Sequence, residues 1–167
     1  MSWVSAGLQA RAVGERGVCL CCRAMSELSP FHLAIPVAEL ASARHFYGET
    51  LGCTEGRSAA TWVDFDFFGH QLVVHLAHGA GEGGSRSAKP VDGDHVPVPH
   101  FGVVLPLDDW QRLVDRLAAR AVVFELAPRR RFVGQPGEQA TVFLRDPSGN
   151  ALEFKGFRDV GRALFAR

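Results

Sequence analysis

The chain has 167 residues, the length of one ordinary domain or of two small units that share a core. Eighteen Lys and Arg residues balance eighteen Asp and Glu residues, and this zero net charge argues against nucleic-acid binders and polybasic membrane-surface proteins, which need a basic excess. A hydrophobic content of 47% is enough for a core, and no apolar run approaches the roughly 20 residues that span a bilayer.

Residues 1–28 show no sustained helical or strand period, so we expect a loose N-terminal tail. Its mildly basic composition leaves a transit peptide open as an alternative, and Met25 is an alternative start. Cys19 and Cys22 form a C-x-x-C pair, but no second pair follows at zinc-finger spacing, so we expect no metal site there. Four cysteines without a disulfide pattern, and no apolar signal stretch, predict a cytoplasmic location.

The first ordered half begins with an apolar, β-prone run at 31–37 and continues into a segment with helical periodicity. The residues expected on the buried helix face are Leu40, Ala43, Phe46, Tyr47 and Leu51. Gly52 stands where a glycine commonly ends a helix. Residues 61–68 and 71–77 then predict a β-hairpin.

The second half repeats this order after a Gly-, Ser- and Pro-rich linker at 78–98. A strand is predicted at 100–106, and a helix follows that either Asp108 or Asp109 caps. The later predicted strands are 122–127, 139–145 and 150–157, with turn chemistry at 146–149.

The repeated order of strand, helix and strands indicates an internal duplication. We therefore expect one α+β domain over 29–158, made of modules 30–77 and 99–158. The segment 159–167 is expected to form a short amphipathic helix whose apolar stripe would suit a homodimer contact.

Three residues with metal-binding side chains stand at matching places on these strands. His32 and His100 open the first strand of each half, and Glu153 lies in the last strand. Two imidazoles and one carboxylate suit a divalent ion of borderline softness and leave coordination positions open for a substrate oxygen or a water. His75 lies on the hairpin strand, on the same face as Gln71.

Glu153 alternates with the apolar Leu152 and Phe154, and this pattern allows two arrangements. Either the two apolar side chains face the core and Glu153 faces water, or they pack under helices and Glu153 points into a polar cavity.

The motifs FYGETLG at 46–52, HFGVVL at 100–105 and DPSGNALEF at 146–154 resemble the vicinal oxygen chelate superfamily. This superfamily includes glyoxalase I, extradiol dioxygenases and bleomycin- and fosfomycin-resistance proteins. The resemblance covers residues 30–158 and implies two βαβββ modules whose sheets curl into one metal cleft.

By position, the resemblance implies that His32, His100 and Glu153 are the metal ligands. His75 falls where glyoxalase I carries a further ligand, and it is implied to act as a catalytic acid or base or as that ligand. The metal would chelate neighbouring oxygens of a small substrate and so stabilise its developing negative charge.

The sequence departs from two family patterns. The glutathione-contacting residues of glyoxalase I are not matched, and Phe143 stands where extradiol dioxygenases carry a tyrosine. The set of two histidines and one carboxylate still suits Fe(II) and O₂ chemistry, so we favour Fe²⁺ and a ring-cleaving dioxygenase. A glyoxalase I-like lyase or isomerase using Zn²⁺, Ni²⁺, Mn²⁺ or Co²⁺ is the alternative, and a non-catalytic drug-binding protein is the third.

Three consecutive arginines at 129–131 open a Gly- and Pro-bearing connection up to residue 139. One interpretation is a lid that attracts an anionic substrate, and the other is a solvated basic turn.

Overall fold

The computed structural model describes residues 28–77, 79, 88–91 and 93–165. The predicted N-terminal tail up to residue 27, with its C-x-x-C pair, lies outside the described residues. None of the described helices is long and apolar enough to cross a membrane.

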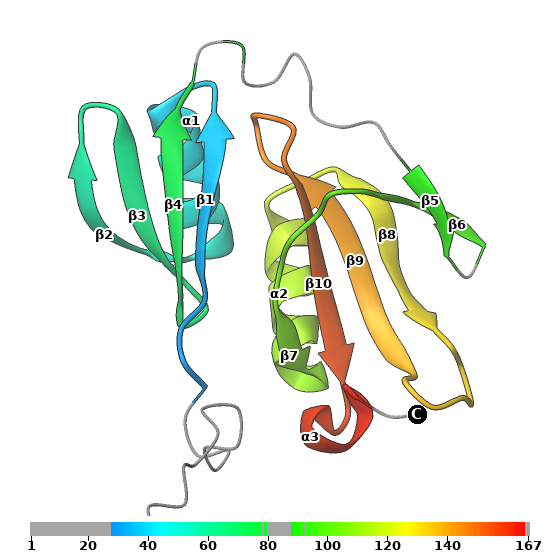
Figure 1. Cartoon of the computed structure of the whole chain (residues 1–167). Coiled ribbons are helices and arrows are strands. Elements are labelled where there is room, and N and C mark those ends of the chain that lie inside the picture. Colours follow the sequence, from blue (N-terminus) through cyan, green and yellow to red (C-terminus); the bar gives the residue numbers. More distant parts are fainter. Residues whose placement is uncertain (1–27, 78, 80–87, 92, 166–167) are drawn as a thin grey trace, which may run out of the picture.

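The first half forms a four-stranded sheet covered on one face by a helix (Figure 1). Its helical segment begins as an α-helix and continues, without a break, as a π-helix. Gly52 ends this segment at a φ of 84°, which confirms the predicted C-cap. The elements are β1 (His32–Val37), α1 (Leu40–Ala43), η2 (Arg44–Leu51), β2 (Thr54–Ala59), β3 (Trp62–Phe67) and β4 (His70–Leu76).

The second half forms another four-stranded sheet, again with a helix on one face (Figure 1). Its elements are β7 (Val104–Pro106), α2 (Leu107–Ala119), β8 (Phe124–Arg131), β9 (Gln139–Arg145) and β10 (Ala151–Phe157). The short α3 (Val160–Ala163) follows the last strand.

The two sheets have the same topology, which confirms the duplication and the α+β fold class. The strand orders are β1-β4-β3-β2 and β7-β10-β9-β8, so each module's first strand lies beside its last. In both modules this first pair is parallel and the other pairs are antiparallel.

One continuous hydrophobic core runs between the sheets and their helices. In the first module Tyr47 and Leu51 lie against the helix-facing side of the sheet, as the helical period predicts. Phe67 joins the two modules, because its ring centroid lies 5.8 Å from that of Phe101 and 6.2 Å from that of Phe154. The two halves therefore fold around a shared core.

A turn between β9 and β10 is organised by the buried carboxylate of Asp146, which is 4% exposed. Its Oδ1 accepts hydrogen bonds from the backbone N–H of Ser148 at 2.9 Å and of Asn150 at 2.8 Å. Its Oδ2 accepts from Asn150 Nδ2 at 2.8 Å and from the Tyr47 hydroxyl of the other module at 2.9 Å. Burial and the neighbouring carboxylate raise the pKa of Tyr47, so its hydroxyl stays a donor.

The same turn also holds the end of β1. Ser148 Oγ accepts from the backbone N–H of Ala38 at 2.9 Å, and Asn150 Nδ2 donates to the Pro36 carbonyl at 2.9 Å. We call residues 146–150 the inter-module clamp, because its side chains bond to both the helix and the first strand of the other module.

Strand β2 is absent from the sequence-based elements. All six of its residues are exposed, and it pairs only with β3 as an edge strand. An edge strand in water carries no alternating apolar pattern, so periodicity could not find it.

The second part of the predicted linker is ordered as a β-hairpin of β5 (Ala88–Val91) and β6 (Asp94–Pro97). Strand β8 also runs four residues further than predicted and includes all three arginines, so the interpretation of these arginines as part of a lid loop is wrong. The predicted cap of α2 is wrong as well: its N-cap is Pro106, and Asp108 and Asp109 lie inside the first turn. There they favour the helix through its dipole instead.

We expect Tyr47→Phe to lower the free energy of unfolding by about 1–2 kcal/mol, because it removes a buried hydrogen bond to a carboxylate. Urea denaturation followed by circular dichroism measures this change. Ser42→Ala is the matched control, since it removes an exposed hydroxyl that donates only to Glu39 in the preceding turn. Equal stability of the Tyr47→Phe variant and the wild type would contradict the assigned role of the clamp.

Candidate functional site

Glu153 faces away from α2 and is 6% exposed. Its neighbours Leu152 and Phe154 belong to the core, and the indole N–H of Trp110 on α2 donates to the Phe154 carbonyl at 2.9 Å. Of the two arrangements that the sequence allowed, the second is therefore correct: the apolar neighbours pack under a helix and Glu153 lies in a buried polar site.

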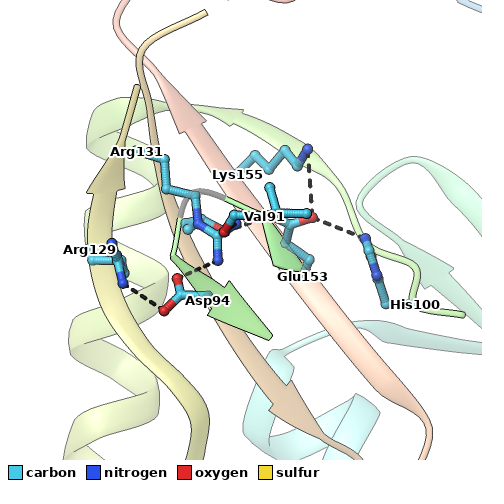
Figure 2. Close-up of polar contacts among 8 residues, drawn as sticks. Val91, Asp94, His100, Arg129, Arg131, Glu153 and Lys155 are labelled. Atoms are coloured by element: carbon cyan, nitrogen blue, oxygen red, sulfur yellow. Dashed lines mark hydrogen bonds and ion pairs between the residues drawn. The ribbon is translucent and has the colours of Figure 1, made fainter. Parts of the chain in front are cut away.

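His100 and Glu153 are in direct contact, as Figure 2 shows. The distance from His100 Nε2 to Glu153 Oε2 is 3.1 Å. On the other side of the ring, Nδ1 donates to the Pro97 carbonyl at 2.6 Å. The other carboxylate oxygen, Oε1, accepts from the Thr141 hydroxyl at 2.6 Å, so both functional side chains are oriented by a second partner.

These contacts shift the two ionisation equilibria in opposite directions. The hydrogen bond to Glu153 raises the pKa of His100, against burial, which would lower it. Burial works to raise the pKa of Glu153, but the hydrogen bonds from His100 and Thr141 outweigh it and lower this pKa. The contact therefore favours the imidazolium and the carboxylate over the neutral pair.

The backbone at Gly102 brings His100 close to β10. Residues 101–103 run beside the strand, and the N–H of Glu153 donates to the Phe101 carbonyl at 2.8 Å. A Cβ atom at Gly102 would lie 1.7 Å from the Glu153 carbonyl oxygen, so only glycine permits this approach.

Two more cationic side chains share the face of the sheet that carries Glu153. Arg129 on β8 is paired with Thr141 on β9, which is paired with Lys155 on β10, so their side chains stand in one row across the strands. Lys155 Nζ lies 3.6 Å from Glu153 Oε2.

The hairpin β5–β6 lies over this face, opposite α2 (Figure 2). Asp94 at the start of β6 pairs with Arg131 at 2.6 Å and with Arg129 at 2.7 Å. The Arg131 guanidinium also lies 5.7 Å from the ring centroid of Phe143, and the His100 ring packs edge-on against the same phenyl ring at 5.2 Å. Phe143 thus separates the arginine pair from the His100–Glu153 pair.

Sequence reasoning missed Asp94, Thr141 and Lys155 as parts of this site. The alternation of β10 was the one signal available for Lys155, which stands two residues after Glu153 and so on the same face. Asp94 lies in a segment whose composition resembles a linker, and no local pattern marks it.

The structure places the other two predicted residues on the first sheet. His32 is exposed, and its Nδ1 lies 2.8 Å from Gln71 Oε1 on β4. His75 is also exposed, and on β4 it shares with Gln71 the face away from the helix. Within the described part of the chain, no three His, Cys, Asp or Glu side chains form a group that could hold one metal ion. The chain therefore brings together His100 and Glu153, and it does not bring His32 to them.

A large surface cavity of about 710 Å³ lies away from these side chains, near α3 and the connection between β8 and β9. Its lining includes Arg130, Glu138 and Arg162. It contains none of the predicted site residues, so its size alone does not mark it as the site.

A family model described as the Glyoxalase/Bleomycin resistance protein/Dioxygenase superfamily matches residues 29–154. The chain belongs to this superfamily. The match confirms the resemblance drawn from the sequence motifs. No functionally curated protein matches the chain.

Solved structures of superfamily members share the fold. A glyoxalase/bleomycin resistance protein/dioxygenase from Alicyclobacillus acidocaldarius is 36% identical, with a TM-score of 0.65 over 80% of this chain and 95% of that one. A lactoylglutathione lyase from Agrobacterium tumefaciens is 18% identical, with a TM-score of 0.52 over 80% and 96% of the two chains. A fosfomycin resistance protein from Listeria monocytogenes is 16% identical, with a TM-score of 0.53 over 80% and 94%.

The donor atoms at His100 and Glu153 fit a divalent metal, which superfamily members typically use. An imidazole nitrogen and a carboxylate oxygen face each other at 3.1 Å, and a bound metal ion would take the place of the proton between them. The Pro97 carbonyl and the Thr141 hydroxyl hold the two side chains from behind, as the outer partners of metal ligands do. The pair supplies two ligands, and Lys155 is a competing cation beside them.

We expect Gly102→Ala to destabilise the protein by about 2–3 kcal/mol and to move His100 away from Glu153, because the added methyl group meets backbone. Thermal unfolding measures the first effect, and the imidazole ¹⁵N shifts of His100 report the second. Gly48→Ala is the matched control, since its Cβ would meet its nearest neighbours at 4.0 Å. Wild-type stability and unchanged His100 signals in Gly102→Ala would contradict this account.

Proposed function

We propose that this superfamily member is a divalent-metal-dependent enzyme that chelates a small, oxygen-rich substrate. The observation that carries the proposal is the buried contact between His100 Nε2 and Glu153 Oε2, on the sheet face away from α2. A buried imidazole–carboxylate pair with oriented outer partners is typical of a metal centre. When bound, the metal would supply Lewis-acid attraction for two neighbouring oxygens of the substrate.

We further propose that His32 is the third ligand and that it comes from a second copy of the chain. His32 is exposed on the first sheet. Its Nδ1 donates a hydrogen bond to Gln71, so its Nε2 carries the lone pair that could bind a metal ion. A homodimer that brings the open face of one chain's first sheet against the second sheet of its partner would complete the set. The superfamily often forms dimers.

His75 is the proposed catalytic acid or base. It is exposed on the same face of the first sheet as Gln71, so a partner that brings His32 to the metal pair would bring His75 to the same opening. An imidazole at that position could move a proton between the substrate and solvent.

Two imidazoles and one carboxylate favour Fe²⁺ and ring cleavage with O₂ within this proposal. The alternative reaction is a glyoxalase I-like lyase or isomerase with Zn²⁺, Ni²⁺, Mn²⁺ or Co²⁺. Oxygen uptake with catechols tests the first reaction, and turnover of methylglyoxal with glutathione tests the second. A cytoplasmic location belongs to the same proposal.

The second candidate function is a binding protein without catalysis. It is favoured by one observation: within the described part of the chain, no group of three side chains could hold one metal ion. Such a protein would use the shape and charge of the face around Arg131 and Lys155, and it would need no metal.

We expect protein purified under anaerobic conditions to contain about one divalent ion per chain. Glu153→Gln should weaken metal affinity at least about 100-fold, because losing a ligand costs more than losing an outer partner. Metal analysis by mass spectrometry measures this. Glu125→Gln on the same sheet is the matched control, since that carboxylate pairs only with Arg145 at the surface. A metal-free wild type would favour the binding protein.

A mixing experiment tests the origin of His32. His32→Ala and Glu153→Gln homodimers should each lack metal, whereas mixed dimers should regain about half of the wild-type content. In a mixed dimer one of the two sites keeps every ligand if each site spans both chains. No recovery in the mixed dimer would place His32 in the same site as Glu153 of its own chain. Full metal content in the His32→Ala homodimer would place His32 outside the site.

A further inference from the structure

We propose that Arg131 and Arg129 form a carboxylate-binding subsite for the substrate, and that Asp94 of the β5–β6 hairpin occupies this subsite when no substrate is bound. The inference rests on the proposed function and adds to it the class of substrate, a carboxylate. It also makes the hairpin a cover that the substrate displaces.

The two guanidinium groups converge on a single carboxylate. Asp94 Oδ2 lies 2.6 Å from Arg131 and Oδ1 lies 2.7 Å from Arg129, so each oxygen has its own arginine (Figure 2). This is the geometry with which proteins recognise a free carboxylate. A carboxylate of a small molecule would be held in the same way.

The burial and the contacts of Arg131 are those expected of a ligand-binding side chain. It is 2% exposed, and its guanidinium lies over the ring of Phe143. Its Nε is buried and has no hydrogen-bond partner among the residues that the structure describes. A buried donor without a partner is costly, and a carboxylate bound side-on would satisfy it through Nε and a terminal nitrogen.

The charges on this face leave an excess for an anion. Arg129, Arg131 and Lys155 supply three cations, against the two carboxylates of Asp94 and Glu153. An incoming carboxylate would thus meet a net positive face even before it displaces Asp94.

Arg131 and His100 both contact the ring of Phe143 on β9, the strand between β8 and β10. Phe143 carries Arg131 at 5.7 Å on one side and His100 at 5.2 Å on the other, measured to its ring centroid. A substrate anchored by its carboxylate at Arg131 would extend over Phe143 and present its other oxygens at His100 and Glu153. The hairpin must move for this. Besides Asp94, it contacts this face through the Val91 carbonyl, 3.5 Å from Arg131, and through the Pro97 carbonyl, which accepts from His100 at 2.6 Å, so a substrate displaces the Asp94 end of the hairpin.

Benzoate and benzamide form a matched pair of probes, since they differ in charge and not in shape. In the full-length protein as purified, we expect benzoate to raise the hydrogen-exchange rate of amides in 88–97 at least about threefold, because it displaces Asp94. Benzamide at the same concentration and ionic strength should have no effect. Asp94→Asn should show the fast exchange without any probe.

Arg131→Gln should abolish the response to benzoate, and Arg129→Gln, which changes a half-exposed side chain, should weaken it if Arg131→Gln fails to fold. A wild-type hairpin that exchanges equally with and without benzoate would overturn the inference, as would an equal response to benzamide. A larger response to inorganic phosphate than to benzoate would overturn the carboxylate assignment.

Glu153→Gln separates this inference from the proposed metal centre. The variant should lose metal and keep its response to benzoate, because Arg131 and Arg129 do not depend on the metal. A metal-free wild type that still responds would reject the proposed enzyme and retain the carboxylate subsite. A metal-containing wild type that does not respond to benzoate would retain the proposed metal centre and reject the carboxylate subsite.

Discussion

The buried carboxylate of Asp146 holds the two modules in one arrangement. It takes four hydrogen bonds, three from its own turn and one from Tyr47 in the other module. A carboxylate that is 4% exposed is stable only when its lone pairs are satisfied, so the turn and the helix must meet in this geometry. Because β10 begins directly after this turn, the clamp also sets where Glu153 stands.

The position of this turn determines where the residues of the candidate site lie. Strand β10 leaves the clamp with Leu152 and Phe154 toward α2 and Glu153 toward the opposite face. Gly102 lets the preceding chain approach within backbone contact, and His100 therefore reaches the carboxylate. Alternation along one strand thus separates the hydrophobic packing that stabilises the module from the polar face that can do chemistry.

The polar face of the second sheet carries two groups of charged side chains. The His100–Glu153 pair has the donor atoms for a metal, and the arginines of β8 have the geometry for a carboxylate. Phe143 lies between them, where its ring contacts both groups. The hairpin β5–β6 contacts both groups, since Asp94 pairs with the arginines and the Pro97 carbonyl accepts from His100.

The amino-acid sequence by itself determined the duplicated α+β fold and the helix faces. Apolar side chains at a period of 3.6 or 2 report burial directly, and the DPSGN turn carries its own hydrogen-bonding chemistry. The tertiary structure decided the rest. The exposed strand β2 has no apolar pattern, and the hairpin at 88–97 is ordered by contacts of Asp94 with a strand about 35 residues away. The partner of His100 and the separation of His32 from it depend on how two sheets meet, which no local pattern encodes.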